Sequence, residues 1–129
     1  MGVQRLSGRD GEEAAARHLI RRGWRLVARN WRGGGGEIDL VAERRGVVAV
    51  CEVKRRGRAD ALEETLTAAQ RDRIVRAAAA FLGSRPDLGR AEVRFDLLLV
   101  GPGRPRVRHL PGAFVAPAGS YSSKRRSAG

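Results

Sequence analysis

The chain has 129 residues, enough for one hydrophobic core but too few for two domains and a linker. Its 26 Lys and Arg against 14 Asp and Glu give a formal net charge of +12, almost all of it from arginine. Arginine forks match phosphate oxygens in pairs, so nucleic acid is the expected partner. A membrane partner is not expected, because no stretch approaches the ~20 apolar residues of a span.

The two ends of the chain bear on localisation and on the domain boundary. No apolar run near Met1 could act as a signal peptide, so a cytoplasmic protein is the simplest interpretation. From residue 116 onward the sequence is rich in Pro, Gly, Ser and basic residues and has no periodicity. We therefore expect one domain over residues 1–115 and a disordered basic tail over 116–129.

The first predicted element is a helix over residues 10–22. Asp10 is placed to cap its start and Gly23 to end it. The residues expected on its inner side are Ala15, Ala16 and Leu19. Glu12 falls on the same inner side.

Three strands are predicted next. Residues 25–31 form the first, and the four glycines at 33–36 form a turn or loop after it. Residues 37–43 and 47–55 then predict a hairpin, because a glycine-containing turn separates two strand-like runs.

A second helix is predicted over residues 61–82, with Gly83 as its end. Its expected apolar stripe is Leu62, Leu66, Ala69, Ile74, Ala77, Ala78 and Phe81. Residues 92–100 and 106–110 predict two more strands. The order helix, three strands, helix, two strands indicates an α/β protein built around a mixed sheet.

The most informative region is GEIDLVA at 36–42 with VVAVCEVKRR at 47–56. Alternation along a strand predicts that Glu37, Asp39 and Val41 share one face. In the same way, Glu52 and Lys54 should share a face with Val48 and Val50. The run around Cys51 is apolar on both faces, so this strand is expected to be buried, with Cys51 as a core residue. A carboxylate there would need compensation.

Two explanations compete for these acids. An ion pair of Lys54 with Glu52 or Asp39 is the ordinary one for an acid and a lysine on a strand. Two converging carboxylates beside one ammonium, however, would leave a net negative pocket that suits Mg²⁺. Such a metal beside Lys54 is the chemistry of phosphodiester cleavage. We favour the metal site.

These residues also resemble a known family. Asp39, a gap of twelve residues, and Glu52-Val53-Lys54 match the PD-(D/E)xK nuclease signature, although its Pro is absent. From about Gly8 to Phe114 the chain resembles the YraN-like bacterial family, which is similar to archaeal Holliday-junction resolvases in motif order. The segments that carry this resemblance are Gly11-Glu12, Arg29-Asn30-Trp31-Arg32, Gly36-Glu37-Ile38-Asp39-Leu40, Glu52-Val53-Lys54 and Arg94-Phe95-Asp96. The resemblance implies a restriction-endonuclease-like core that depends on Mg²⁺ or Mn²⁺.

The resemblance also implies residue roles. Asp39 and Glu52 would be metal ligands, the carbonyl of Val53 a third, and Lys54 the catalytic lysine. Glu12 would be a helix acid near the metal. The alternative interpretation is a solvated acid that the helix dipole favours at this position. Glu37 either supports the ligands or is a charge at the edge of a loop.

Some positions are less clearly functional. The family usually has a Lys where this chain has Gln70, which can hydrogen-bond a phosphate or a water but brings no charge. Asp96 is expected to pair with an arginine and hold the sheet. His18 and His109 look isolated, which is typical of surface or packing groups. The arginines expected to hold a phosphate backbone are Arg32, Arg55, Arg56 and Arg58.

The function expected from these residues is a metal-dependent endonuclease. DNA is favoured over RNA as its partner, and branched or structured DNA over a defined sequence, since few groups could read bases. The alternative is a non-catalytic nucleic-acid-binding protein that keeps the nuclease fold. A basic protein that binds acidic partners or membranes would explain the charge but not the acids. Related resolvases act as dimers, so by analogy a homodimer is a candidate assembly.

Overall fold

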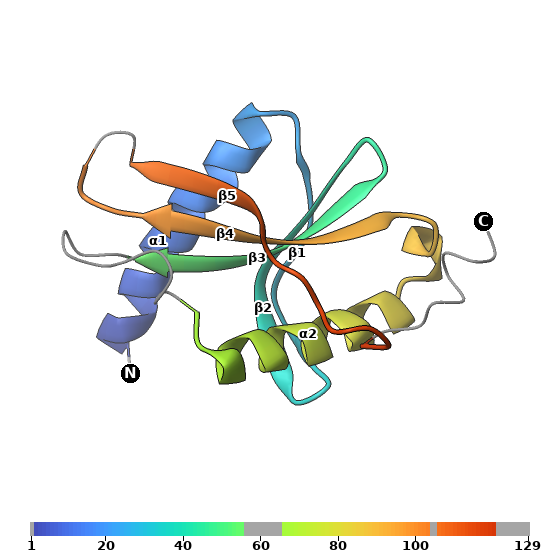
Figure 1. Ribbon diagram of the computed structural model, residues 1–129. Helices are drawn as coiled ribbons and strands as arrows, with labels where there is room; N and C mark the ends of the chain where they lie inside the picture. The colour runs from blue at the N-terminus through green and yellow to red at the C-terminus, as the bar shows by residue number, and fades with distance from the viewer. Residues whose placement is uncertain (1, 56–65, 104–105, 121–129) are drawn as a thin grey trace.

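The computed structural model describes residues 2–55, 66–103 and 106–120, and only the backbone for residues 2–10. The elements in chain order are α1 (Gly2–Arg21), β1 (Arg25–Gly33), β2 (Gly36–Arg44), β3 (Val47–Arg55), α2 (Ala68–Gly83), the 3-10 helix η2 (Pro86–Leu88), β4 (Glu92–Val100) and β5 (Val107–Phe114). The predicted order of helices and strands is confirmed, and η2 is an addition to it (Figure 1).

The strands form one mixed sheet in the order β1-β2-β3-β4-β5. Neighbouring strands are antiparallel except β3 and β4, which are parallel. Parallel neighbours need a crossover connection, and α2 lies in the one that joins β3 to β4. The two helices cover opposite faces of the sheet (Figure 1). The fold is therefore a mixed α/β architecture consistent with a restriction-endonuclease-like core.

Each face of the sheet has its own hydrophobic core. Along β3, Val48 and Val50 pack into the core under α2, while Ala49 and Cys51 pack into the core under α1. These four side chains are at most 1% exposed. The prediction that the strand around Cys51 is buried on both faces is confirmed.

The start of α1 differs from the prediction. The helix begins at Gly2, so Asp10 lies within it, and the prediction that Asp10 caps its start is wrong. The inner side is as expected, since Ala15, Ala16 and Leu19 are fully buried. At the other end the Gly23 N–H donates to the Ile20 carbonyl at 3.0 Å, and Gly23 has φ +89°. This left-handed conformation suits glycine and ends the helix where the sequence predicts.

The start of α2 differs as well. Leu62, with the rest of residues 61–65, lies outside the described residues, and the helix begins at Ala68 rather than at 61. The reason is a capping box: Thr67 Oγ1 accepts from the Gln70 N–H at 3.1 Å, and Gln70 Oε1 accepts from the Thr67 N–H at 2.9 Å. Ala69 is exposed, so its place in the apolar stripe is wrong, and Val75 and Leu82 are buried instead.

The C-terminal strand is longer than predicted. β5 runs to Phe114, whose ring stacks on Phe95 with the centroids 4.9 Å apart. The chain then continues past Ala116, which packs against the core under α2. Residues 121–129 lie outside the described residues, so the domain boundary and the disordered tail stay predictions.

Candidate active site

The glycine run forms a tight hairpin tip that lies against α2. Gly34 and Gly35 have φ +63° and +82° and make the turn between β1 and β2. A Cβ on Gly36 would lie only 2.2 Å from the Arg73 carbonyl oxygen, and one on Gly34 only 2.5 Å from that of Arg76. The helix backbone therefore passes where side chains would be, which explains the glycines at these positions. This close approach makes the hairpin one wall of a pocket and α2 the other.

Asp39 lies where β2 leaves β3. The ladder between these strands ends at the pair Leu40 and Cys51. Beyond it, Asp39 Oδ2 accepts a hydrogen bond from the Val53 N–H at 2.8 Å, so the side chain replaces the missing strand partner. Strict alternation along β2 is therefore wrong at this residue: Leu40 packs under α1, while both Ile38 and Val41 pack under α2.

In β1, the alternation of side chains between the two faces of the sheet is also interrupted opposite Asp39. Register places Asn30 of β1 opposite Asp39, and Asn30 has a positive φ of 49°. Before it, Arg29 reaches Glu13 of α1 at 3.2 Å; after it, the Trp31 ring packs on α2. The β1-β2 hairpin is thus twisted at the residues that hold Asp39.

Val53 offers a second main-chain group at this point. In a strand the N–H and C=O of one residue point to the same side. Because the Val53 N–H points to Asp39, the Val53 carbonyl also points into the space from which β2 has departed. The predicted main-chain ligand is therefore directed toward the Asp39 side of β3.

Glu52 and Asp39 converge, as the sequence predicts. Their carboxyl groups lie close enough for each to shift the pKa of the other. Burial and the neighbouring Asp39 carboxylate raise the pKa of Glu52 to about 8. Burial also raises the pKa of Asp39, although the bond from Val53 opposes it. The pair consequently keeps a proton near neutral pH that separated carboxylates would lose.

Lys54 supplies a positive charge beside this pair. Its Nζ lies 3.7 Å from Glu52 Oε2, and both side chains are mostly buried. The ion pair predicted as the ordinary explanation is therefore present, but one ammonium faces two carboxyl groups. It balances the single negative charge of the protonated pair, but not the two charges of the pair when both acids are ionised.

Glu12 approaches the acids from α1. Burial and the charge of Asp39 raise its pKa, while a hydrogen bond with Asn30 opposes the shift. The side chain is only partly exposed. The structure thus favours a helix acid near Asp39 over a fully solvated one.

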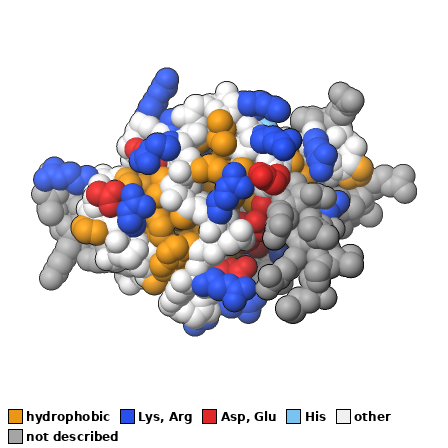
Figure 2. Space-filling model, turned by 180° about the vertical axis from the view of Figure 1, so that it is seen from behind, with side chains coloured by type: hydrophobic (Ala, Val, Ile, Leu, Met, Phe, Trp, Pro, Cys, Tyr) orange, Lys and Arg blue, Asp and Glu red, His pale blue; other side chains and the backbone are white. Residues whose placement is uncertain are grey.

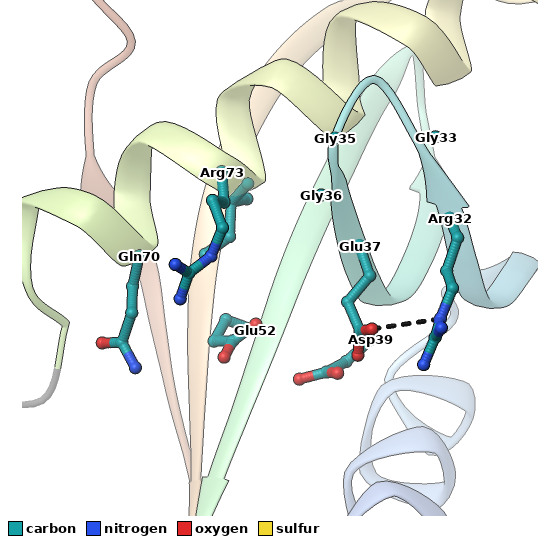
Figure 3. Close-up of a pocket in the computed structure, with 10 residues that line it drawn as sticks. Arg32, Gly33, Gly35, Gly36, Glu37, Asp39, Glu52, Gln70 and Arg73 are labelled. Carbon is teal, nitrogen blue, oxygen red and sulfur yellow. Dashed lines mark ion pairs between the residues drawn. The ribbon is translucent and has the colours of Figure 1, made fainter.

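The pocket between hairpin and helix encloses about 610 Å³ (Figure 3). Its lining residues are Arg32, Gly33, Gly35, Gly36, Glu37, Asp39, Glu52, Gln70, Arg73 and Ile74. Arg73 is absent from the predicted site. Its position one turn after Gln70 on the same helix was the available signal, since residues i and i+3 share a helix face.

Gln70 has a structural role in addition to its place in the pocket. Its side-chain oxygen accepts from the Thr67 N–H and completes the cap of α2. The Gln70 side chain thus fixes the start of the helix at the pocket rim.

The predicted phosphate-binding arginines are spread out. Arg32 lines the pocket and pairs with Glu37 at 3.2 Å, and both side chains are largely exposed. Arg55 lies at the end of β3, where its Cγ is near Gly11 of α1. Arg56 and Arg58 lie outside the described residues.

The donor set suits a hard cation. Two carboxyl groups and a main-chain carbonyl are oxygen ligands, and Mg²⁺ is commonly held by one or two carboxylates with waters completing its shell. A divalent ion would take the place of the shared proton and neutralise the two carboxylates. Within residues 11–55, 66–103 and 106–120, no three His, Cys, Asp or Glu side chains form a metal-binding group.

Asp96 belongs to a different cluster, on the α1 side of the sheet. It accepts two bonds from Arg94, at 2.9 and 2.8 Å, one from the Gly112 N–H at 3.0 Å, and lies 2.7 Å from His109 Nε2. The predicted arginine pair is confirmed. His109 is not isolated, because it also packs edge-on to His18, with the ring centroids 6.3 Å apart.

Figure 2 shows acidic side chains in a short band on one half of this face and at separate places on the other half. Lys and Arg side chains lie beside both groups. A polyanion could therefore meet positive charge beside these acids.

The fold and pocket define a mixed α/β protein with a paired-acid site where two strands separate. The chain belongs to the uncharacterised protein family UPF0102, whose model matches residues 11–100. It is 46% identical over 110 residues to a UPF0102 protein of Rhodopseudomonas palustris, covering 85% of this chain and 84% of that protein. It is also 46% identical over 111 residues to one of Paramagnetospirillum magneticum, covering 83% and 85%. None of the described helices has the length and hydropathy of a membrane span.

Proposed function

We propose that this protein is a metal-dependent endonuclease that hydrolyses phosphodiester bonds in DNA. The observation that carries the proposal is the convergence of Asp39 and Glu52 at a pocket in a chain of net charge +12. A protein that only binds nucleic acid gains nothing from two acids there, because they repel phosphate unless a cation intervenes.

Asp39, Glu52 and the Val53 carbonyl would hold Mg²⁺ or Mn²⁺. When bound, such an ion makes a water more acidic and neutralises charge on a phosphate oxygen. Asp39 is fixed for this role by the Val53 N–H, and Lys54 is held beside Glu52. The Lys54 ammonium would orient a water or offset negative charge that develops on phosphorus.

The test is cleavage of labelled single-stranded, duplex and four-way-junction DNA with Mg²⁺, Mn²⁺ or EDTA. We expect metal-dependent cutting that Asp39→Ala, Glu52→Ala and Lys54→Ala each reduce by roughly 100-fold or more. Binding at low salt should be retained by the Asp39 and Lys54 variants.

Glu43→Gln is the matched control. Glu43 is an acid on the same hairpin, but it lies away from the pocket and pairs with Arg25. It should cut like the wild type. Wild-type cutting by Asp39→Ala or Lys54→Ala would contradict the proposed site. No cutting, with binding that weakens steeply in salt, would instead support a non-catalytic nucleic-acid-binding protein.

A further inference from the structure

Two arginines line the pocket, and they differ in what faces them. Arg32, on the hairpin wall, pairs with Glu37 at 3.2 Å. Arg73, on the helix wall, has no ion pair with any described carboxylate. Figure 3 shows the Arg73 side chain extending from α2 toward the side of the pocket where Glu52 lies. The helix wall thus presents an arginine whose charge no carboxylate of the described residues matches.

We infer that Arg73 binds the substrate phosphate in this pocket and positions it over Asp39 and Glu52. The inference rests on the proposed nuclease function and adds a residue to it. An arginine presents planar N–H donors that match two phosphate oxygens at once. The acids lie on the sheet side of the pocket and Arg73 on the helix side. A phosphate between them would face the metal ion held by the acids on one side and the Arg73 guanidinium on the other.

Arg73 can be changed without disturbing the wall that carries it. Its side chain is exposed, and the contact with Gly36 is made by its backbone carbonyl, which every substitution retains. Alanine is also the best helix former. A loss in Arg73→Ala would therefore reflect the missing guanidinium and not a changed fold.

Arg76 provides a closely matched control on the same helix. It too is exposed, and its carbonyl makes the same kind of close approach, to Gly34. Its side chain differs in pairing with Asp72 at 3.3 Å and does not line the pocket. Arg76→Ala therefore removes the same charge from the same helix but leaves the pocket unchanged.

The experiment measures binding of a fluorescent DNA oligonucleotide with Ca²⁺ in place of Mg²⁺ across a salt series, and cleavage with Mn²⁺. We expect Arg73→Ala to raise both Kd and KM by roughly 10-fold, as for loss of a charge-assisted hydrogen bond. The slope of log K against log salt should fall by about one. Arg73→Lys should recover part of the affinity, and Arg76→Ala should change binding far less.

The outcomes separate this inference from the proposed function. Equal effects of Arg73→Ala and Arg76→Ala, in a wild type that cuts, would overturn the role of Arg73 and leave the nuclease intact. Arg73-specific loss of binding, in a wild type that does not cut, would keep Arg73 as a phosphate-binding residue and reject the nuclease. A wild type that neither binds nor cuts would overturn both.

Discussion

Asp39 and Asp96 are the two charged side chains that the described part of the chain buries, at 9% and 0% exposure. Both lie in the same sheet, but their neighbours differ. Asp96 accepts from Arg94, His109 and Gly112, so these bonds outweigh burial and lower its pKa to about 2. Asp39 accepts a hydrogen bond from the Val53 N–H, but it also faces two other acids, Glu52 and Glu37, and the more distant charge of Lys54 offsets them only in part.

The comparison separates a structural carboxylate from a functional one. A buried charge that serves only the fold is surrounded by donors, as Asp96 is. Two neighbouring buried acids whose pKa values are both raised cost stability when both are ionised, and such groups cluster at functional sites. The number of donors around each acid, rather than burial, distinguishes the two regions.

The largest expected effect is on the structural side. Asp96→Ala leaves Arg94 and His109 without their carboxylate, so the free energy of unfolding should fall by about 3–5 kcal/mol. Urea unfolding measures it. Asp87→Ala is the control, because Asp87 makes the same paired contact with Arg85 two residues away but in solvent. Equal losses in the two variants would break the comparison.

At Glu52 we expect a smaller effect on the free energy of unfolding, and one of opposite sign, because this carboxyl group destabilises the folded protein when it is ionised. Its folded pKa is about 8 and its ordinary value 4.5, so the folded protein binds more protons than the unfolded chain between these values. Stability therefore falls as pH rises from about 5 to 8, by roughly 3 kcal/mol after allowing for its remaining exposure. The readout is the difference between wild type and Glu52→Gln in EDTA. A difference that does not change with pH would contradict the raised pKa.

The smallest effect is the acid response of Asp96. Its folded pKa of about 2 lies below the ordinary 3.8, so it stabilises the protein above pH 4. That contribution, about 2 kcal/mol, should be lost as pH falls from about 4 to 2. Unfolding of wild type and Asp96→Asn along this range measures it. If the two proteins lose stability in parallel, the hydrogen bonds to Asp96 do not stabilise its ionised form.

Much of the fold could be predicted because its signals are local. Strand and helix order follow from periodicity and glycines, and β4 has its predicted bounds of Glu92–Val100. The start of α2 could not be predicted from its apolar stripe, because the Thr67 cap decides it. Ala69 shows the same limit, since a small residue fits an exposed position as well as a buried one.

The candidate site also has features that the sequence predicts and features that it does not. Asp39, Glu52 and Lys54 could be brought together from neighbouring strands and their spacing. The reversal of faces at Asp39 could not, because it depends on how β2 separates from β3. Arg73 and the contact of His109 with Asp96 also depend on packing between elements distant in sequence.

Calorimetric titration of Mn²⁺ into wild type and Asp39→Asn at pH 7, in buffers of different ionisation enthalpy, tests the cation site most directly. Because Glu52 holds a proton at this pH, the wild type should bind Mn²⁺ and release roughly one proton, while Asp39→Asn should bind far more weakly. Equal binding by both proteins, or no binding by the wild type at millimolar Mn²⁺, would contradict the assignment of Asp39 and Glu52 as a metal site.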